Sequence, residues 1–174
     1  MESNVLTANV ATTHNVLTPE QFLKHWQGHR DLTRRTIEKF PDDKLFTYSI
    51  GGMRPFSALA MEVLGIASAG VHGFATNGEW KKMDELLAHT GATNPTTKAA
   101  LLHLWDIVTA QIDEYWPRIA SGDFQRQMKA FGMYDGTVSS LLLYFVDNEI
   151  HHRGQGYVYL RSLDIEPPFF WDRH

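Results

Sequence analysis

Apolar residues recur every three or four positions over four long stretches of the chain, which is the spacing of amphipathic helices. The first helix is expected from residue 18 to about Phe40, because Thr18, Pro19 and Gln21 form a capping box with proline at the first helical position. Its inward stripe is Phe22, Trp26, His29, Thr33 and Ile37. This pattern predicts a helix that packs one face against a core.

Turn, capping and proline signals place the other three helices at residues 56–74, 94–117 and 137–163. Pro117 is expected to end or kink the third of these helices. Only residues 124–134 are compatible with a short extended piece. The connections exceed the roughly two to eight residues usual between neighbouring helices of a bundle. We therefore predict an all-α four-helix bundle with long crossover connections.

The chain fits one domain, residues 1–174, with a bundle core over about 18–163 and a tail over 164–174. Without cysteine, any metal must be bound by histidine, carboxylate, amide or water. A net charge of −4 with scattered basic residues disfavours nucleic-acid binding. No segment resembles a signal peptide or a membrane span, so we expect a soluble, cytoplasmic protein that does not bind membranes.

The fourth predicted helix turns polar at its middle, over residues 148–155. At 3.6 residues per turn, one stripe of this helix contains Leu141, Phe145, Asn148, His152, Gln155 and Tyr159. Burying an amide and an imidazole costs about 1 to 3 kcal/mol each unless something hydrogen-bonds or coordinates them. The functional site is therefore expected at Asn148 and His152.

Four segments of the chain resemble one family of metal-binding proteins. They are the sequence Met-Arg-Pro-Phe at 53–56, the segments 131–137 and 157–161, and the His-Arg-Gly-Gln run within 148–155, which is the most specific. Over about residues 18–171 the chain resembles the DinB/YfiT-like family. The resemblance implies a four-helix bundle with crossover connections, a homodimer, and one divalent metal held by three histidines.

In this chain the positions that match those three ligands hold Glu62, Asn148 and His152. Because a carboxylate, an amide oxygen and an imidazole form a harder site than three imidazoles, affinity for zinc or nickel should fall. A manganese, iron or zinc ion completed by water is one expectation. An empty, hydrogen-bonded cluster of the same three residues is the other.

The resemblance implies an enzyme in which the metal activates water or a substrate group, with thiol-dependent S-transfer or hydrolysis as the expected reaction class. The alternative is a non-catalytic, stress-related dimer or small-ligand-binding protein whose polar cluster is structural. The sequence does not identify the substrate, the metal or the inducing condition.

The neighbours of His152 allow further interpretations. Glu149 and His152 spell the Glu-x-x-His pair of di-metal bundles, but no second copy exists, so Glu149 is expected at the surface or behind the ligands. His151 points away and should be exposed, and Arg153 should form a salt bridge. Gln155 is placed to orient a water or a substrate. The remaining candidate ligand pair, His25 and His29, is expected to serve ordinary packing or to be exposed.

Overall fold

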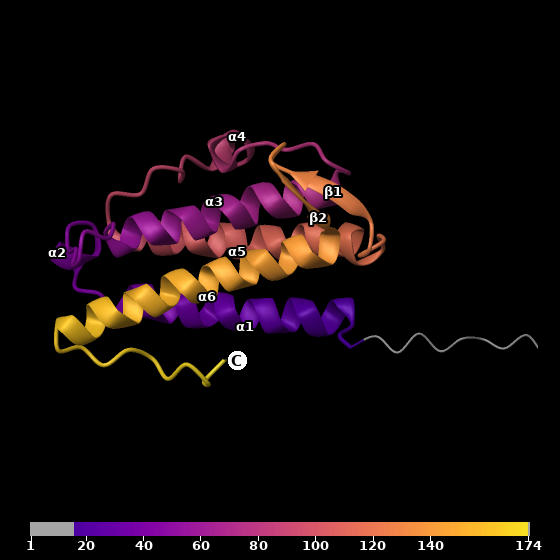
Figure 1. Ribbon diagram of the computed structural model, residues 1–174. Coiled ribbons are helices and arrows are strands. Elements are labelled where there is room, and N and C mark those ends of the chain that lie inside the picture. Colours follow the sequence, from indigo (N-terminus) through magenta and orange to yellow (C-terminus); the bar gives the residue numbers. More distant parts are fainter. Residues whose placement is uncertain (1–15, 174) are drawn as a thin grey trace, which may run out of the picture.

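The computed structural model describes residues 16–173 and places four long helices in one bundle (Figure 1). The bundle helices are α1 (Pro19–Lys39), α3 (Phe56–Ala75), α5 (Lys98–Ala120) and α6 (Val138–Ser162). The connections contain α2 (Asp42–Leu45), α4 (Met83–Leu87), the 3-10 turn η1 (Ala88–Thr90), and the strands β1 (Gln127–Ala130) and β2 (Tyr134–Thr137). The predicted all-α bundle is confirmed.

The helices are arranged so that sequence neighbours do not always pack together. Helix α1 packs against α5 and α6, and α3 packs against the same two helices. The pairs α1/α3 and α5/α6 therefore lie at diagonal corners, so the connections between them cross the ends of the bundle. Because α3 and α5 run in the same direction, segment 76–97 must return along the whole bundle, and it does so over α3 (Figure 1).

The helix ends follow the local sequence signals with small shifts. At α1 the capping box is formed, with Thr18 Oγ1 accepting from the Gln21 backbone and Gln21 Oε1 accepting from the Thr18 backbone. Helix α5 begins at Lys98, capped by Thr97, which is later than the predicted start. Pro117 does not end this helix at once: the helix continues for three more residues, to Ala120.

The extended piece expected within 124–134 is the first strand of a β-hairpin. Strands β1 and β2 pair antiparallel from Gln127 opposite Thr137 to Ala130 opposite Tyr134. The turn between them contains two successive residues with positive φ, Phe131 at 54° and Gly132 at 70°. A phenylalanine in this conformation is unusual, and the centroid of its ring lies 5.1 Å from that of Trp80 and 6.1 Å from that of Phe145.

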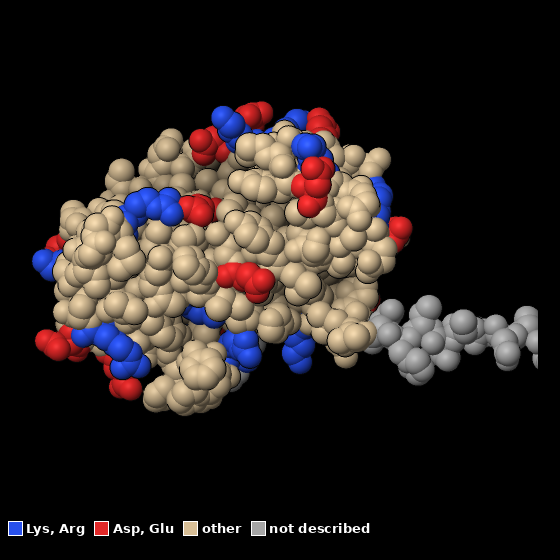
Figure 2. Space-filling model, in the orientation of Figure 1, with Lys and Arg blue, Asp and Glu red and all other residues tan. Residues whose placement is uncertain are grey.

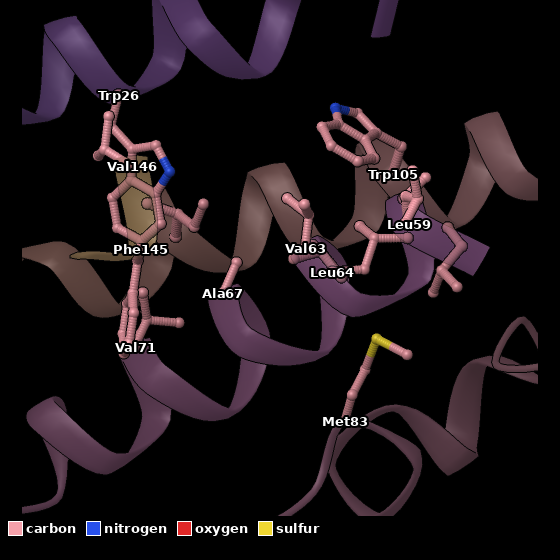
Figure 3. Packing of buried hydrophobic residues seen from close by; sticks show 14 of the residues in the cluster. Trp26, Leu59, Val63, Leu64, Ala67, Val71, Met83, Trp105, Phe145 and Val146 are labelled. Atoms are coloured by element: carbon pink, nitrogen blue, oxygen red, sulfur yellow. The ribbon is translucent and has the colours of Figure 1, made fainter. Parts of the chain in front are cut away.

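The core lies between the four helices and is built largely on α3. Figure 3 shows Leu59, Val63 and Ala67 of α3 among residues from the other helices, and Met83 on the opposite side of α3 from Trp105. Helix α3 is long and apolar enough to cross a membrane, with a mean hydropathy of 1.4, but 67% of that window is buried inside the bundle. Its apolar character is therefore that of a core helix in a globular domain.

Candidate metal centre

Helices α3 and α6 bring the three predicted ligand residues together. Glu62 Oε1 lies 3.0 Å from His152 Nε2 and 3.4 Å from Asn148 Nδ2. Asn148 and His152 are buried, one turn apart on α6, while the Glu62 side chain is one-third exposed on the facing side of α3. The expected meeting of an acid, an amide and an imidazole is present, and its open side is at Glu62.

The imidazole of His152 is held from both sides. Its Nδ1 lies 2.9 Å from Gln155 Oε1, and its Nε2 faces the Glu62 carboxylate. Gln155 therefore orients the histidine rather than a water or a substrate. A proton on Nε2 is donated to Glu62, whereas a proton on Nδ1 is donated to Gln155 and leaves the Nε2 lone pair free, which is the arrangement that metal-binding histidines share.

An arginine that the sequence interpretation missed completes the surroundings of Glu62. Arg54 Nη2 donates to Glu62 Oε2 over 2.6 Å, and the Arg54 carbonyl accepts a hydrogen bond of 2.7 Å from the buried Tyr159 hydroxyl. Partial burial would raise the pKa of the Glu62 carboxyl, but hydrogen bonds from Arg54, His152 and Asn148 outweigh it and lower the pKa from 4.5 to about 2. Glu62 is therefore an anion at neutral pH.

The site contains one buried acceptor that the protein does not satisfy. Asn148 Oδ1 has no hydrogen-bond partner, although its Nδ2 faces Glu62. Across residues 16–173, no three histidine, aspartate or glutamate side chains gather closely enough to hold a metal on their own. Any ion here would therefore need the amide oxygen of Asn148, with water, beside Glu62 and His152.

Glu149 lies elsewhere, contrary to the expectation of a surface or supporting position. Its side chain is fully buried against α1, where Thr33 Oγ1 donates to Oε1 over 2.6 Å and Arg30 Nη1 lies 3.6 Å from Oε2. Asn148 and Glu149 are successive residues on a helix, so their side chains diverge by roughly 100° toward different neighbours. Glu149 thus belongs to a second polar cluster, away from His152.

Arg153 joins this second cluster through hydrogen bonds, not through the expected salt bridge. Its guanidinium donates to the His29 carbonyl, to Thr33 Oγ1 and, over 2.9 Å, to His29 Nδ1. His29 is buried, and its Nε2 lies 3.2 Å from His25 Nε2 and 2.9 Å from Arg173 Nη1. Burial, and then the charge of Arg153, lower the pKa of His29 from 6.5 to about 3. The pair His25/His29 therefore serves packing and hydrogen bonding, and His151 is exposed as expected.

Comparison with known proteins assigns the chain to a family. The profile of the DinB family matches residues 9–171. The chain belongs to the DinB family. Its fold is similar to a DinB-like protein from Bacillus subtilis, with a TM-score of 0.64 at 22% identity over 86% of this chain and 96% of that one. It is also similar to a DinB-like protein from Bacillus cereus, with a TM-score of 0.62 at 18% identity over 86% and 95% of the two chains. No curated protein matches the sequence.

Proposed function

We propose that this DinB-family protein is a metal-dependent enzyme whose single divalent ion is bound by Glu62, Asn148 and His152. The observation that supports this most directly is the pair of acceptor oxygens on opposite sides of His152. A neutral imidazole carries one N–H, so one of these two contacts has no hydrogen. With the Nδ1 proton donated to Gln155, the Nε2 lone pair would face the Glu62 carboxylate, and a divalent ion held by both groups would offset the repulsion between them.

The donor set fits this role in two further respects. Asn148 Oδ1 is a buried acceptor in want of a partner, and amide oxygens are ligands for hard divalent ions. Glu62 stays ionised at neutral pH, so it supplies the negative charge that an imidazole and an amide lack. Such an oxygen-rich set favours manganese or iron, and zinc completed by water.

The residues around His152 and Glu62 have distinct roles in this proposal. Gln155 holds the tautomer and the ring orientation of His152, and Tyr159 fixes the backbone of Arg54. Glu62 would supply Oε1 to the ion, and Arg54 donates a hydrogen bond to its outer oxygen, Oε2. A bound ion would lower the pKa of a coordinated water or thiol, which is the chemistry needed for the transfer or hydrolysis class that the family resemblance suggests.

The second candidate is that the cluster of Glu62, Asn148 and His152 is purely structural, and the ion pair between Arg54 and Glu62 supports it. The Arg54 guanidinium already neutralises Glu62, and a protonated His152 would satisfy both of its acceptor oxygens without any ion. In that case the domain would bind a small molecule, or nothing, without catalysis.

Metal retention after desalting separates the two candidates. Purified protein loaded in turn with Mn²⁺, Fe²⁺ and Zn²⁺ should retain about one ion per chain, and Glu62→Ala and His152→Ala should each lose most of it. The matched control is His151→Ala, which changes an exposed histidine next to His152 and should leave retention unaltered. Substoichiometric metal in the parent protein would leave the structural cluster as the better account.

We also propose that the protein self-associates through the outer face of α6. Leu143, Ile150 and Val158 lie on this helix with exposed fractions of 50%, 39% and 53%. Figure 2 shows one acidic side chain in the middle of the face on which α6 lies, and by helical spacing the exposed Asp147 falls on the same stripe as these three residues. A stripe that is apolar apart from this one acid is suited to pairing with the same stripe of a second copy. Sedimentation should give a dimer for the parent chain and a monomer for Ile150→Glu.

A further inference from the structure

A cavity of about 440 Å³ that opens broadly to solvent lies beside Glu62, between α3 and the segment that returns over it. Its apolar wall is formed by Met61, Ile66, Ala69, Met83 and Phe131. Its volume lies in the range of small-molecule sites in proteins. Because Glu62 is part of the same wall, the cavity and the candidate centre share one carboxylate.

The glycines of α3 differ in what surrounds them. A side chain at Gly70 would overlap the ring of Phe145, and one at Gly73 would overlap Trp80, so close packing explains both residues. At Gly65, by contrast, an added Cβ would meet no atom within 4 Å, and Gly65 lines the cavity. A longer side chain at Gly65 would therefore extend into the cavity one turn from Glu62.

The segment that returns over α3 contributes Lys82, Met83 and Asp84 to the cavity, and the hairpin turn contributes Phe131. Met83 reaches toward α3 from one side, and Phe131 from the hairpin turn closes the other (Figure 3 for Met83). Lys82 and Asp84 contribute one positive and one negative charge to the lining, which also includes Thr93 and Asn94. Arg54 pairs with Glu62. The charges around the cavity therefore sum to zero, so it offers no net attraction to a ligand of either sign.

We propose, resting on the function proposed above, that this cavity is the substrate cleft of the Glu62 centre. It takes a small organic molecule that is uncharged and apolar over most of its surface. Such a ligand places its apolar body against Met61, Met83 and Phe131. Its one hydrogen-bonding group then points along α3 to the carboxylate of Glu62. Because methionine side chains are flexible, they adapt to ligands of different shapes. The cleft therefore discriminates between ligands by their polarity more than by their shape.

Methyl NMR of metal-free protein tests the cleft without any assay of activity. With methionine methyl groups labelled, 2-phenylethanol should shift the signals of Met61 and Met83, while the exposed Met133 should stay in place. Phenylacetate and phenethylamine have the same apolar body with opposite charges, and each should bind at least about tenfold more weakly. Gly65→Leu fills the space and should weaken the binding of 2-phenylethanol at least about tenfold.

Gly154→Leu is the matched control, because Gly154 is a mid-helix glycine of α6 with equally open surroundings and no place in the cavity. It should leave the Met61 and Met83 shifts unchanged. The proposal fails if 2-phenylethanol leaves both signals in place, if Gly65→Leu binds it as tightly as the parent, or if a charged analogue binds best. Loss of the metal site alone would not alter these shifts, so the two proposals can fail separately.

Discussion

Helix α6 carries two polar clusters that begin one residue apart and differ in almost every physical respect. Asn148 and His152 face α3, where they meet a half-open carboxylate and where the Asn148 Oδ1 acceptor has no partner. Glu149 and Arg153 face α1, where Thr33 hydrogen-bonds both of them, while Glu149 Oε2 and Arg30 Nη1 lie 3.6 Å apart, buried and without a hydrogen bond. Each pair has the spacing of one helical turn, and the neighbouring helix decides what the pair does.

The two clusters also differ in which cations balance their carboxylates and in how exposed those cations are. Around Glu62, one exposed arginine balances the carboxylate, so the site can exchange that arginine for another cation. Around Glu149, the buried Arg30 forms an ion pair with the carboxylate, and the buried Arg153 feels the same negative charge without contacting it in a salt bridge. Burial lowers the pKa of Arg30 to about 10 despite the nearby charge of Glu149. The open cluster of Glu62, Asn148 and His152 is therefore suited to bind a cation. The closed cluster around Glu149 and Arg153 is suited to fix how α1 packs on α6.

The largest expected effect follows from removing the carboxylate of the closed cluster. Glu149→Gln leaves Arg30 and Arg153 without their counter-charge and should destabilise the fold by about 3 to 5 kcal/mol. Urea unfolding followed by circular dichroism measures this. Asp147→Asn is the matched control, since Asp147 is an exposed acid on the same helix, and its change should stay within about 0.5 kcal/mol. Equal unfolding midpoints for the two variants would show that the buried pair contributes nothing to stability.

The sequence predicts the fold and the three members of the open cluster better than it predicts their partners. Helical periodicity and capping locate the long helices, and the family resemblance points to Glu62, Asn148 and His152. Arg54 was missed because it precedes α3 in a turn, and periodicity says nothing about which way a turn residue reaches. Glu149 was misplaced because a helix facing two neighbours has two inward stripes, and the apolar pattern reveals only one of them.

Acid should weaken the closed cluster first. The unfolded chain takes up a proton at His29 near pH 6.5, whereas the folded imidazole, with a pKa of about 3, does not. Stability is therefore greatest above pH 6.5 and falls as the pH decreases toward 3, by about 1.4 kcal/mol per pH unit for one proton. Denaturant midpoints between pH 7 and 4 test this slope. His29→Gln cannot take up the proton, so its profile should be flatter, and an unchanged slope would assign the acid sensitivity to another group.

Removing the arginine from the open cluster should have the smallest effect on stability and the clearest effect on binding. Arg54→Ala deletes a half-exposed ion pair, so the free energy of unfolding at pH 7 should change by less than about 1 kcal/mol. Without that guanidinium the carboxylate of Glu62 is free for a divalent ion, and affinity for Mn²⁺, followed by calorimetry, should rise several-fold.

The same change acts on the acid side of Glu62, which gives a second measurement. The folded pKa of about 2 means that the stabilisation from this carboxylate is complete above pH 4.5 and is lost as the pH falls toward 2. Arg54→Ala removes one of the hydrogen bonds that lower this pKa, so the loss should begin at higher pH. Suppose instead that the Mn²⁺ affinity is unchanged while the acid transition moves to higher pH. Arg54 then serves only to keep Glu62 ionised, and the cluster that faces α3 is as structural as the cluster that faces α1.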